Sequence, residues 1–327
     1  MGTNDTLLVV IDNDDDVEAL PCLARAVQLA QAMNAGIEVF CPVYDPYIAG
    51  ERFFDSPDLD AAKSAYVRQM NDRMQTIAES VRAADVRVSV DVVWDAPVYE
   101  AIVRKVLRSR PLMVVRNNHY HHRLKRSIFS NDDWSLIRTC PAPLLITRPK
   151  RKDSEPLNVC AAIDPVHEHD KPAALDGKIF QQASDLATCT GGSLQVLHAY
   201  DPTPVIASTG VNAYMPVIVD ADAIATSVRD QHRTAANRFA EQYALDAKQI
   251  ALVQGSARKV IVQHAIEAAV DIMVMGAVSR GFLARALVGH TAEQVLDRMP
   301  CDVMIVKPDS FVTPVHAKSP HRFVDAA

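Results

Sequence analysis

The sequence contains one long internal repeat, which restricts the possible folds more than any other feature does. Residues 7–16 resemble residues 157–166, and both stretches are apolar runs that lead to an aspartate, Asp12 in the first half and Asp164 in the second. Six segments recur in the same order in both halves, at an offset of about 150–160 residues. Collinear similarity of this extent predicts two homologous domains, and each half is long enough to bury its own core.

The predicted boundary between the domains lies in a short linker. Residues 148–157 are charged, contain proline and lack a hydrophobic period, as linkers do. We therefore expect a first domain over residues 1–149 and a second over residues 157–309. Residues 310–327 show no pattern, and we expect them to form a loose tail.

The order of apolar segments in each half predicts an α/β fold. Strand-length runs such as "LLVVI" and "DIMVMG" are apolar almost throughout, which is typical of parallel strands buried on both faces. Segments with a helical period alternate with these runs, so each half should form a doubly wound sheet of five parallel strands. In such sheets, ligands bind beyond the carboxyl ends of the strands. The residues at the predicted carboxyl ends, which locate the candidate sites, are Asp12, Asp164, Gly255 and Gly276.

Charge and composition exclude several classes of protein. The formal net charge of −6 argues against a nucleic-acid partner, because phosphate backbones require a basic surface. No apolar run approaches the roughly 18 residues of a membrane span, and the first residues lack the basic and apolar regions of a signal peptide. The six cysteines include no CxxC pair, which predicts reduced thiols in a cytoplasmic protein.

The chain resembles the universal stress protein family, and in particular its tandem-domain E type. The resemblance rests on the two strand-end aspartates, on "GAVSRGFLARALVGHTAEQV", and on the endings "TCPAPLLITRP" and "MPCDVMIVKP". It extends over about residues 5–308 in two copies. It implies the adenine nucleotide alpha hydrolase-like fold with strand order 3-2-1-4-5, and a function in the stress response. It also implies domains that pair through their fifth strands, either within one chain or in a homodimer.

Nucleotide-binding members of the family carry G-x2-G-x9-G-[S/T] after the fourth strand, and the second half keeps this spacing. Gly276 and Gly289 match the first and third glycines of the motif. Ser279 replaces the second glycine, and His290 replaces the hydroxyl residue, which Thr291 follows. Glycines let backbone N–H groups approach phosphate oxygens, and a helix N-terminus favours an anion. The resemblance therefore implies that ATP or a related adenine nucleotide binds in the second domain only.

Two further residues complete the implied nucleotide site. From its strand end, Asp164 could reach a ribose or a base, or it could cap the segment that follows. Val196, in the second strand of the same half, is the remaining candidate contact. A strand-to-helix turn retained for packing explains the glycines as well, so both interpretations stay open at this point.

The first half has lost the phosphate loop. The corresponding stretch, "VRNNHYHHRLKRSIFSNDDWSLI", contains no glycine, and Arg116 is expected where the second half has Gly276. We therefore expect no backbone phosphate cradle in the first domain. Three histidines in this stretch lack a carboxylate or cysteine that would complete a metal site, and so no bound metal is expected at His119, His121 and His122.

No catalytic motif accompanies these features, because the sequence has no GxSxG elbow, no HExxH and no Walker loop. We expect a binding module, with weak ATP hydrolysis as a lesser alternative. The main alternative is a scaffold or carrier that ignores nucleotides and binds an apolar ligand or a protein partner. It depends on the long apolar segment 201–223, whose side chains could cover a pocket or pack over the sheet: Val205, Ile206, Tyr214, Met215, Val217 and Ile218.

Overall fold

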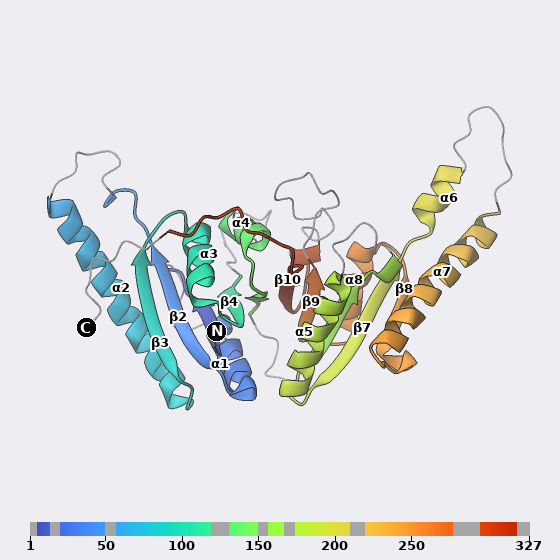
Figure 1. Cartoon of the computed structure of the whole chain (residues 1–327), viewed down its shortest axis with the longest axis horizontal. Helices are drawn as coiled ribbons and strands as arrows, with labels where there is room; N and C mark the ends of the chain where they lie inside the picture. Colours follow the sequence, from blue (N-terminus) through green and yellow to red (C-terminus); the bar gives the residue numbers. More distant parts are fainter. Residues whose placement is uncertain are drawn as a thin grey trace. The chain divides into compact units, whose positions relative to one another are not determined.

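The computed structural model of the chain consists of two compact units (Figure 1). It describes residues 5–13, 20–49, 57–118, 131–149, 156–166, 174–209, 220–276 and 295–318. The first unit comprises Met1–Lys152 together with Phe311–Ala327, and the second comprises Asp153–Ser310. The division after Lys152 falls inside the expected linker.

Among the described residues, the first unit has five parallel strands in the order β3-β2-β1-β4-β5. These strands are β1 (Thr6–Val10), β2 (Gly36–Val43), β3 (Val88–Trp94), β4 (Met113–Asn117) and β5 (Leu144–Thr147). The helices that connect them are α1 (Pro21–Met33), α2 (Pro57–Ala83), α3 (Val98–Ser109) and α4 (Asn131–Thr139).

The described part of the second unit repeats this arrangement, with the order β8-β7-β6-β9-β10. Its strands are β6 (Asn158–Ile163), β7 (Ser193–Tyr200), β8 (Ile250–Gln254), β9 (Ile272–Gly276) and β10 (Asp302–Val306). Its helices are α5 (Leu175–Cys189), α6 (Thr203–Thr209), α7 (Ala221–Gln242) and α8 (Ala257–Glu267), and a 3₁₀ turn, Ala247–Gln249, precedes β8. Helix α6 lies in the long apolar segment 201–223.

Numbered within its own unit, each sheet has the order 3-2-1-4-5, so the predicted doubly wound α/β fold is confirmed. The central strands are apolar because helices cover both faces of each sheet. Leu7, Leu8, Val9 and Val10 of β1 are fully buried, as are Val159, Cys160 and Ala161 of β6. No helix in the described ranges is both long enough and apolar enough to cross a membrane.

Residues 311–318 are not a loose tail. They belong to the first unit and extend past α4 and α3 (Figure 1). Val315 is buried, and the Arg108 guanidinium of α3 donates a hydrogen bond to the Lys318 carbonyl oxygen at 3.2 Å. The sequence did not reveal this contact, because an extended segment that packs through single side chains has no hydrophobic period.

Candidate functional site

Arg116 occupies the carboxyl edge of the first sheet. It lies in β4 and is 3% exposed. Its Nη2 donates to Asp12 Oδ2 at 2.6 Å, and its Nη1 lies 3.0 Å from Asp133 Oδ1. Asp12 follows β1, and Asp133 lies in the first turn of α4. The guanidinium therefore joins two carboxylates at the place where this fold binds ligands.

The electrostatics of this cluster keep Arg116 charged. Burial lowers the pKa of the guanidinium, but the charges of Asp12 and Asp133 outweigh burial and raise the pKa above its ordinary value. Nη1 meets Asp133 as an ion pair without hydrogen-bond alignment, so Nη1 and Nε are buried with no hydrogen-bond partner among the described residues. The guanidinium is buried and paired with two carboxylates, so it is not available to a phosphate group at this edge.

The strand register corrects one expectation from the sequence: the counterpart of Gly276 is Asn117 and not Arg116. Asn117 pairs with Thr147, the last residue of the fifth strand of its unit, and Gly276 pairs with Val306, the last residue of the other fifth strand. Adjacent residues in a strand point to opposite faces of the sheet, so this one-residue difference changes the side chain that faces each helix. The alignment of two apolar runs could not fix the register, because the pairing with a neighbouring strand sets it.

Asn117 has a structural role that sequence reasoning missed. Its Oδ1 accepts a hydrogen bond from the Cys22 backbone N–H at 2.8 Å and one from Thr147 Oγ1 at 3.3 Å. Helix α1 begins at Pro21, and Leu20 at its N-cap makes no side-chain hydrogen bond. Asn117 therefore supplies an acceptor for a first-turn N–H that the N-cap residue leaves unpaired.

Gly276 lies against α5 in the second unit. A Cβ atom at this position would come within 2.9 Å of Leu175 Cδ2 and 3.2 Å of Ile179 Cδ1. Among the described glycines, positive φ angles occur at Gly191 and Gly255 only, so the backbone conformation of Gly276 does not itself require glycine. The close approach of α5 is a packing reason for this glycine, independent of any phosphate.

Two other predicted site residues lie in the described part of the second unit. The Asp164 backbone N–H, just after β6, donates to Asp176 Oδ1 at 3.2 Å. Val196 is fully buried inside β7, where it pairs with Ala161 and Ile250. Val196 therefore lies in the core and not at the carboxyl edge, and we do not retain it as a ligand contact.

The remaining predicted residues fall outside the ranges that the structure describes. They are the four loop positions Ser279, Gly289, His290 and Thr291, and the histidines His119, His121 and His122. Among the residues that are described, no group of three or more metal-ligating side chains comes together.

Sequence reasoning also missed a pair of imidazoles in the second unit. His198 of β7 is fully buried, and its Nδ1 lies 3.2 Å from the Ile163 carbonyl oxygen. Its Nε2 lies 2.8 Å from His232 Nδ1 of α7, and the two rings stack with their centroids 4.9 Å apart. A carbonyl can only accept, so His198 Nδ1 carries a proton and, in the neutral pair, Nε2 accepts from His232. The pair forms a polar connection between β7 and α7.

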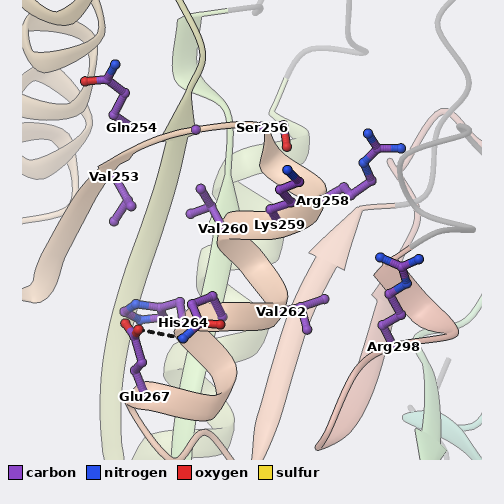
Figure 2. A pocket seen from close by; sticks show the side chains of 12 residues that line it. Val253, Gln254, Ser256, Arg258, Lys259, Val260, Val262, His264, Glu267 and Arg298 are labelled. Carbon is purple, nitrogen blue, oxygen red and sulfur yellow. Dashed lines mark hydrogen bonds between the residues drawn. The ribbon is translucent and has the colours of Figure 1, made fainter.

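A cavity of about 590 Å³ lies along α8 (Figure 2). Its lining includes apolar side chains of Val253, Val260 and Val262. It also includes three cationic side chains, those of Arg258, Lys259 and Arg298. Arg258 and Arg298 lie on the same side of the helix (Figure 2). None of these residues was singled out in the sequence, because the chain brings them together only through the packing of α8.

His264 closes one side of this cavity. Its Nε2 lies 3.1 Å from Gln195 Oε1 of β7. Burial lowers the pKa of His264, although the charge of Glu267 acts in the opposite direction. The imidazole is therefore held in its neutral form and makes a neutral hydrogen bond to the sheet.

Comparison with known proteins agrees with the two-domain organisation. Residues 3–148 and 160–307 match the model of the Universal stress protein family. Universal stress protein E of Salmonella typhi is 29% identical over 316 residues, which cover 96% of this chain and 98% of the relative. Universal stress protein E of Escherichia coli (strain K12) is 28% identical over the same length.

Solved structures show the same fold. A putative universal stress protein from Pseudomonas aeruginosa UCBPP-PA14 superposes with a TM-score of 0.65 at 22% identity, covering 93% of this chain and 94% of that chain. A universal stress protein from Archaeoglobus fulgidus DSM 4304 superposes with a TM-score of 0.60 at 13% identity, covering 94% and 99%. The fold therefore extends over nearly the whole length of these proteins.

Proposed function

The chain is a tandem member of the universal stress protein family, of the E type, and from this premise we propose that it is a cytoplasmic stress-response module whose second domain binds ATP or a related adenine nucleotide. Its six cysteines are free thiols, which suits a reducing compartment. The observation that carries the proposal is the difference between the carboxyl edges of the two sheets.

In the first domain, an internal ion-pair cluster occupies the edge. Arg116 pairs with Asp12, whose counterpart is the proposed sugar contact Asp164, and with Asp133 at the start of the helix that would receive phosphates. In the second domain, the residue before Gly276 is Met275, which is the counterpart of Arg116 and is 6% exposed. No arginine therefore reaches Asp164 from this strand position. The sequence spacing of Gly276 to Gly289 supports a loop whose backbone N–H groups could donate to phosphate oxygens.

Isothermal titration of the full chain with ATP tests this assignment, and we expect one site per chain. Asp164→Asn should weaken binding by about tenfold, because a charge-assisted hydrogen bond to the sugar is lost. The matched variant Asp12→Asn should leave the affinity unchanged. Gly289→Val should abolish binding, and Ser279→Gly should strengthen it or leave it unaltered. Two sites per chain, or no heat at millimolar ATP in either wild type or Ser279→Gly, would refute the proposal.

The second candidate function is a nucleotide-independent scaffold, and the contact of Gly276 with Leu175 and Ile179 favours it. This contact accounts for the first motif glycine without a ligand. Val205, one of the apolar residues that could cover a pocket or pack over the sheet, is 43% exposed. Four others lie outside the described residues: Tyr214, Met215, Val217 and Ile218. Native mass spectrometry of protein purified from cells separates the two functions, because only the first predicts a copurified nucleotide.

A further inference from the structure

Helices α3 and α8 occupy equivalent positions in their units. Lys105 Nζ of α3 lies 2.6 Å from Glu38 Oε1 of β2, and His264 Nε2 of α8 lies 3.1 Å from Gln195 Oε1 of β7. In the strand register, Glu38 pairs with Leu8 of β1, and Gln195 pairs with Cys160 of β6. The two contacts are therefore the same helix-to-sheet contact, and they fix which residues of the two helices correspond.

This correspondence identifies one outward face on each helix. The face consists of three residues that are four apart, so they lie in one row along the helix. In α3 the row is Glu100, Arg104 and Arg108, and in α8 it is Lys259, Gln263 and Glu267.

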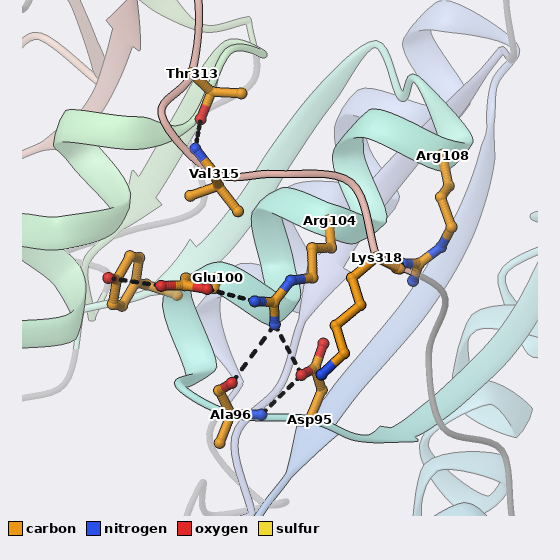
Figure 3. A network of polar contacts seen from close by, with 9 residues as sticks. Asp95, Ala96, Glu100, Arg104, Arg108, Thr313, Val315 and Lys318 are labelled. Carbon is orange, nitrogen blue, oxygen red and sulfur yellow. Dashed lines mark hydrogen bonds and ion pairs between the residues drawn. The ribbon is translucent and has the colours of Figure 1, made fainter.

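In the first unit, an extended segment runs along this face. Figure 3 shows Thr313, Val315 and Lys318 following α3, next to the side chains of the row. Val315 is 9% exposed, and Arg108 donates to the Lys318 carbonyl oxygen at 3.2 Å. The rest of the row is held by ion pairs within the unit, because Arg104 contacts both Asp95 and Glu100.

In the second unit, the equivalent row lines the cavity of about 590 Å³ along α8. Its three residues, Lys259, Gln263 and Glu267, are all part of the cavity lining, and Gln263 Nε2 donates to Glu267 Oε1 at 2.7 Å (Figure 2). Residues 311–318 lie along α3, so this segment of the same chain does not cover α8.

The charges of the two faces are reversed at both ends. Glu100 of α3 corresponds to Lys259 of α8, and Arg108 corresponds to Glu267. The segment on α3 carries His316 and Lys318 and no carboxylate. At the α8 cavity, Arg258 and Arg298 add to the charge of Lys259, and the N-terminus of the helix adds a partial positive charge.

We propose that the groove along α8 binds an extended, acidic peptide segment of a partner protein, in the way that residues 311–318 lie along α3. Carboxylates of the peptide meet the cationic end of the groove, defined by Arg258, Lys259 and Arg298. An apolar side chain of the peptide takes the role of Val315 and contacts Val253, Val260 or Val262. The short groove, with three cationic side chains and one carboxylate at Glu267, matches a short acidic segment better than the continuous phosphates of a nucleic acid. This inference is independent of nucleotide binding.

The test uses the full chain and three fluorescein-labelled peptides. The first is the chain's own segment, FVTPVHAK. Lys318 lies at Arg108, the counterpart of Glu267, so the residues that reach the cationic end precede Val315 (Figure 3). The second peptide, FEEPVHAK, therefore carries glutamate at the positions of Val312 and Thr313, and the third, GEEPGHAK, has the same charge without Phe311 and Val315. Fluorescence anisotropy should show binding of FEEPVHAK that weakens with added salt. The other two peptides should bind at least about tenfold more weakly.

Charge-reversal variants locate the binding. Arg258→Glu with Lys259→Glu should remove binding of FEEPVHAK. Arg298→Glu alone should weaken it to a smaller extent. The control, Arg229→Glu with Arg233→Glu on the exposed surface of α7, changes the net charge of the same unit equally and should bind as wild type does. Circular dichroism melting confirms that each variant is folded.

Four outcomes would overturn the proposal. FEEPVHAK does not bind, or it loses binding equally in the α7 control. FVTPVHAK binds as tightly as FEEPVHAK, which would assign the groove to the C-terminal segment of a second copy. GEEPGHAK binds equally and inorganic pyrophosphate displaces it, which would make the groove a site for small anions.

Discussion

His264 Nε2 and Gln195 Oε1 lie 3.1 Å apart, in the place that Lys105 and Glu38 take in the first unit. The same position between a helix and its sheet thus holds an ion pair in one domain and a neutral hydrogen bond in the other. A buried charge depends on its partners far more than a neutral group does. The two domains should therefore respond differently to mutation and to pH at this position.

Replacing Lys105 by methionine should strongly destabilise the first domain. Lys105 Nζ lies 2.6 Å from Glu38 and 2.8 Å from Asp91, so its loss leaves two carboxylates facing each other. We expect the free energy of unfolding to fall by about 3 kcal/mol. The only two tryptophans, Trp94 and Trp134, both lie in the first unit, so tryptophan fluorescence in urea reports on this domain.

The matched variant His264→Met should lower the free energy of unfolding of the second domain by only about 1 kcal/mol, because it removes a neutral hydrogen bond. Far-UV circular dichroism reports on both domains, so the loss in the second domain is read from the part of the transition that tryptophan fluorescence does not show. Equal losses in the two variants would contradict the difference between a charged and a neutral contact.

The second domain should lose stability in mild acid. Burial lowers the pKa of His264 in the folded state below its ordinary value of 6.5. As the pH falls below 6.5, the unfolded chain takes up a proton that the folded domain binds less readily, so stability decreases with falling pH. Urea midpoints measured by circular dichroism should therefore fall as the pH is lowered from 7.5 to 5. The midpoint of the His264→Gln variant should fall less over the same range. His316→Gln, at an exposed histidine, is the control, and a slope in His264→Gln equal to that of wild type would exclude His264 as the cause.

Replacing Arg116 by methionine, its counterpart in the second domain, should destabilise the first domain by about 3 kcal/mol, because two carboxylates lose their buried cation. Asp133→Asn in the Arg116→Met background should restore part of this loss. Tryptophan fluorescence in urea measures the four members of this double-mutant cycle. Strictly additive losses would mean that Arg116 and Asp133 do not interact.

Replacing Gly276 by alanine should lower the free energy of unfolding of the second domain by only about 1 kcal/mol. The atoms that the new Cβ would meet are the methyl ends of Leu175 and Ile179, and these flexible side chains can shift. Gly192→Ala should cost clearly more, since its Cβ would lie 2.0 Å from the Leu157 carbonyl oxygen of the backbone. Thermal melting followed by circular dichroism ranks the two. If Gly276→Ala were the more damaging variant, close packing against α5 would not explain this glycine.

The sequence was sufficient to predict the two domains and their strand order, because apolar runs and collinear repeats report directly on buried parallel strands. It was not sufficient to set the strand register to within one residue. Arg116 was therefore expected to be the counterpart of Gly276, and the structure shows that Asn117 is. The resemblance to the family suggested Val196, which the structure places in the core. Pairs such as Arg116 with Asp133, or His198 with His232, join residues whose proximity depends on how each helix packs, and no local pattern encodes it.

Because residues 311–318 complete the first unit, its chain is discontinuous, and this affects how the protein is made. On a ribosome, the bulk of the first unit emerges long before its last segment does. About 160 residues of the second unit must be translated in between, which takes roughly ten to thirty seconds at ordinary elongation rates. During that interval the surface of α3 is bare on the nascent chain. We expect the first domain to reach its final state only after the second has been synthesised.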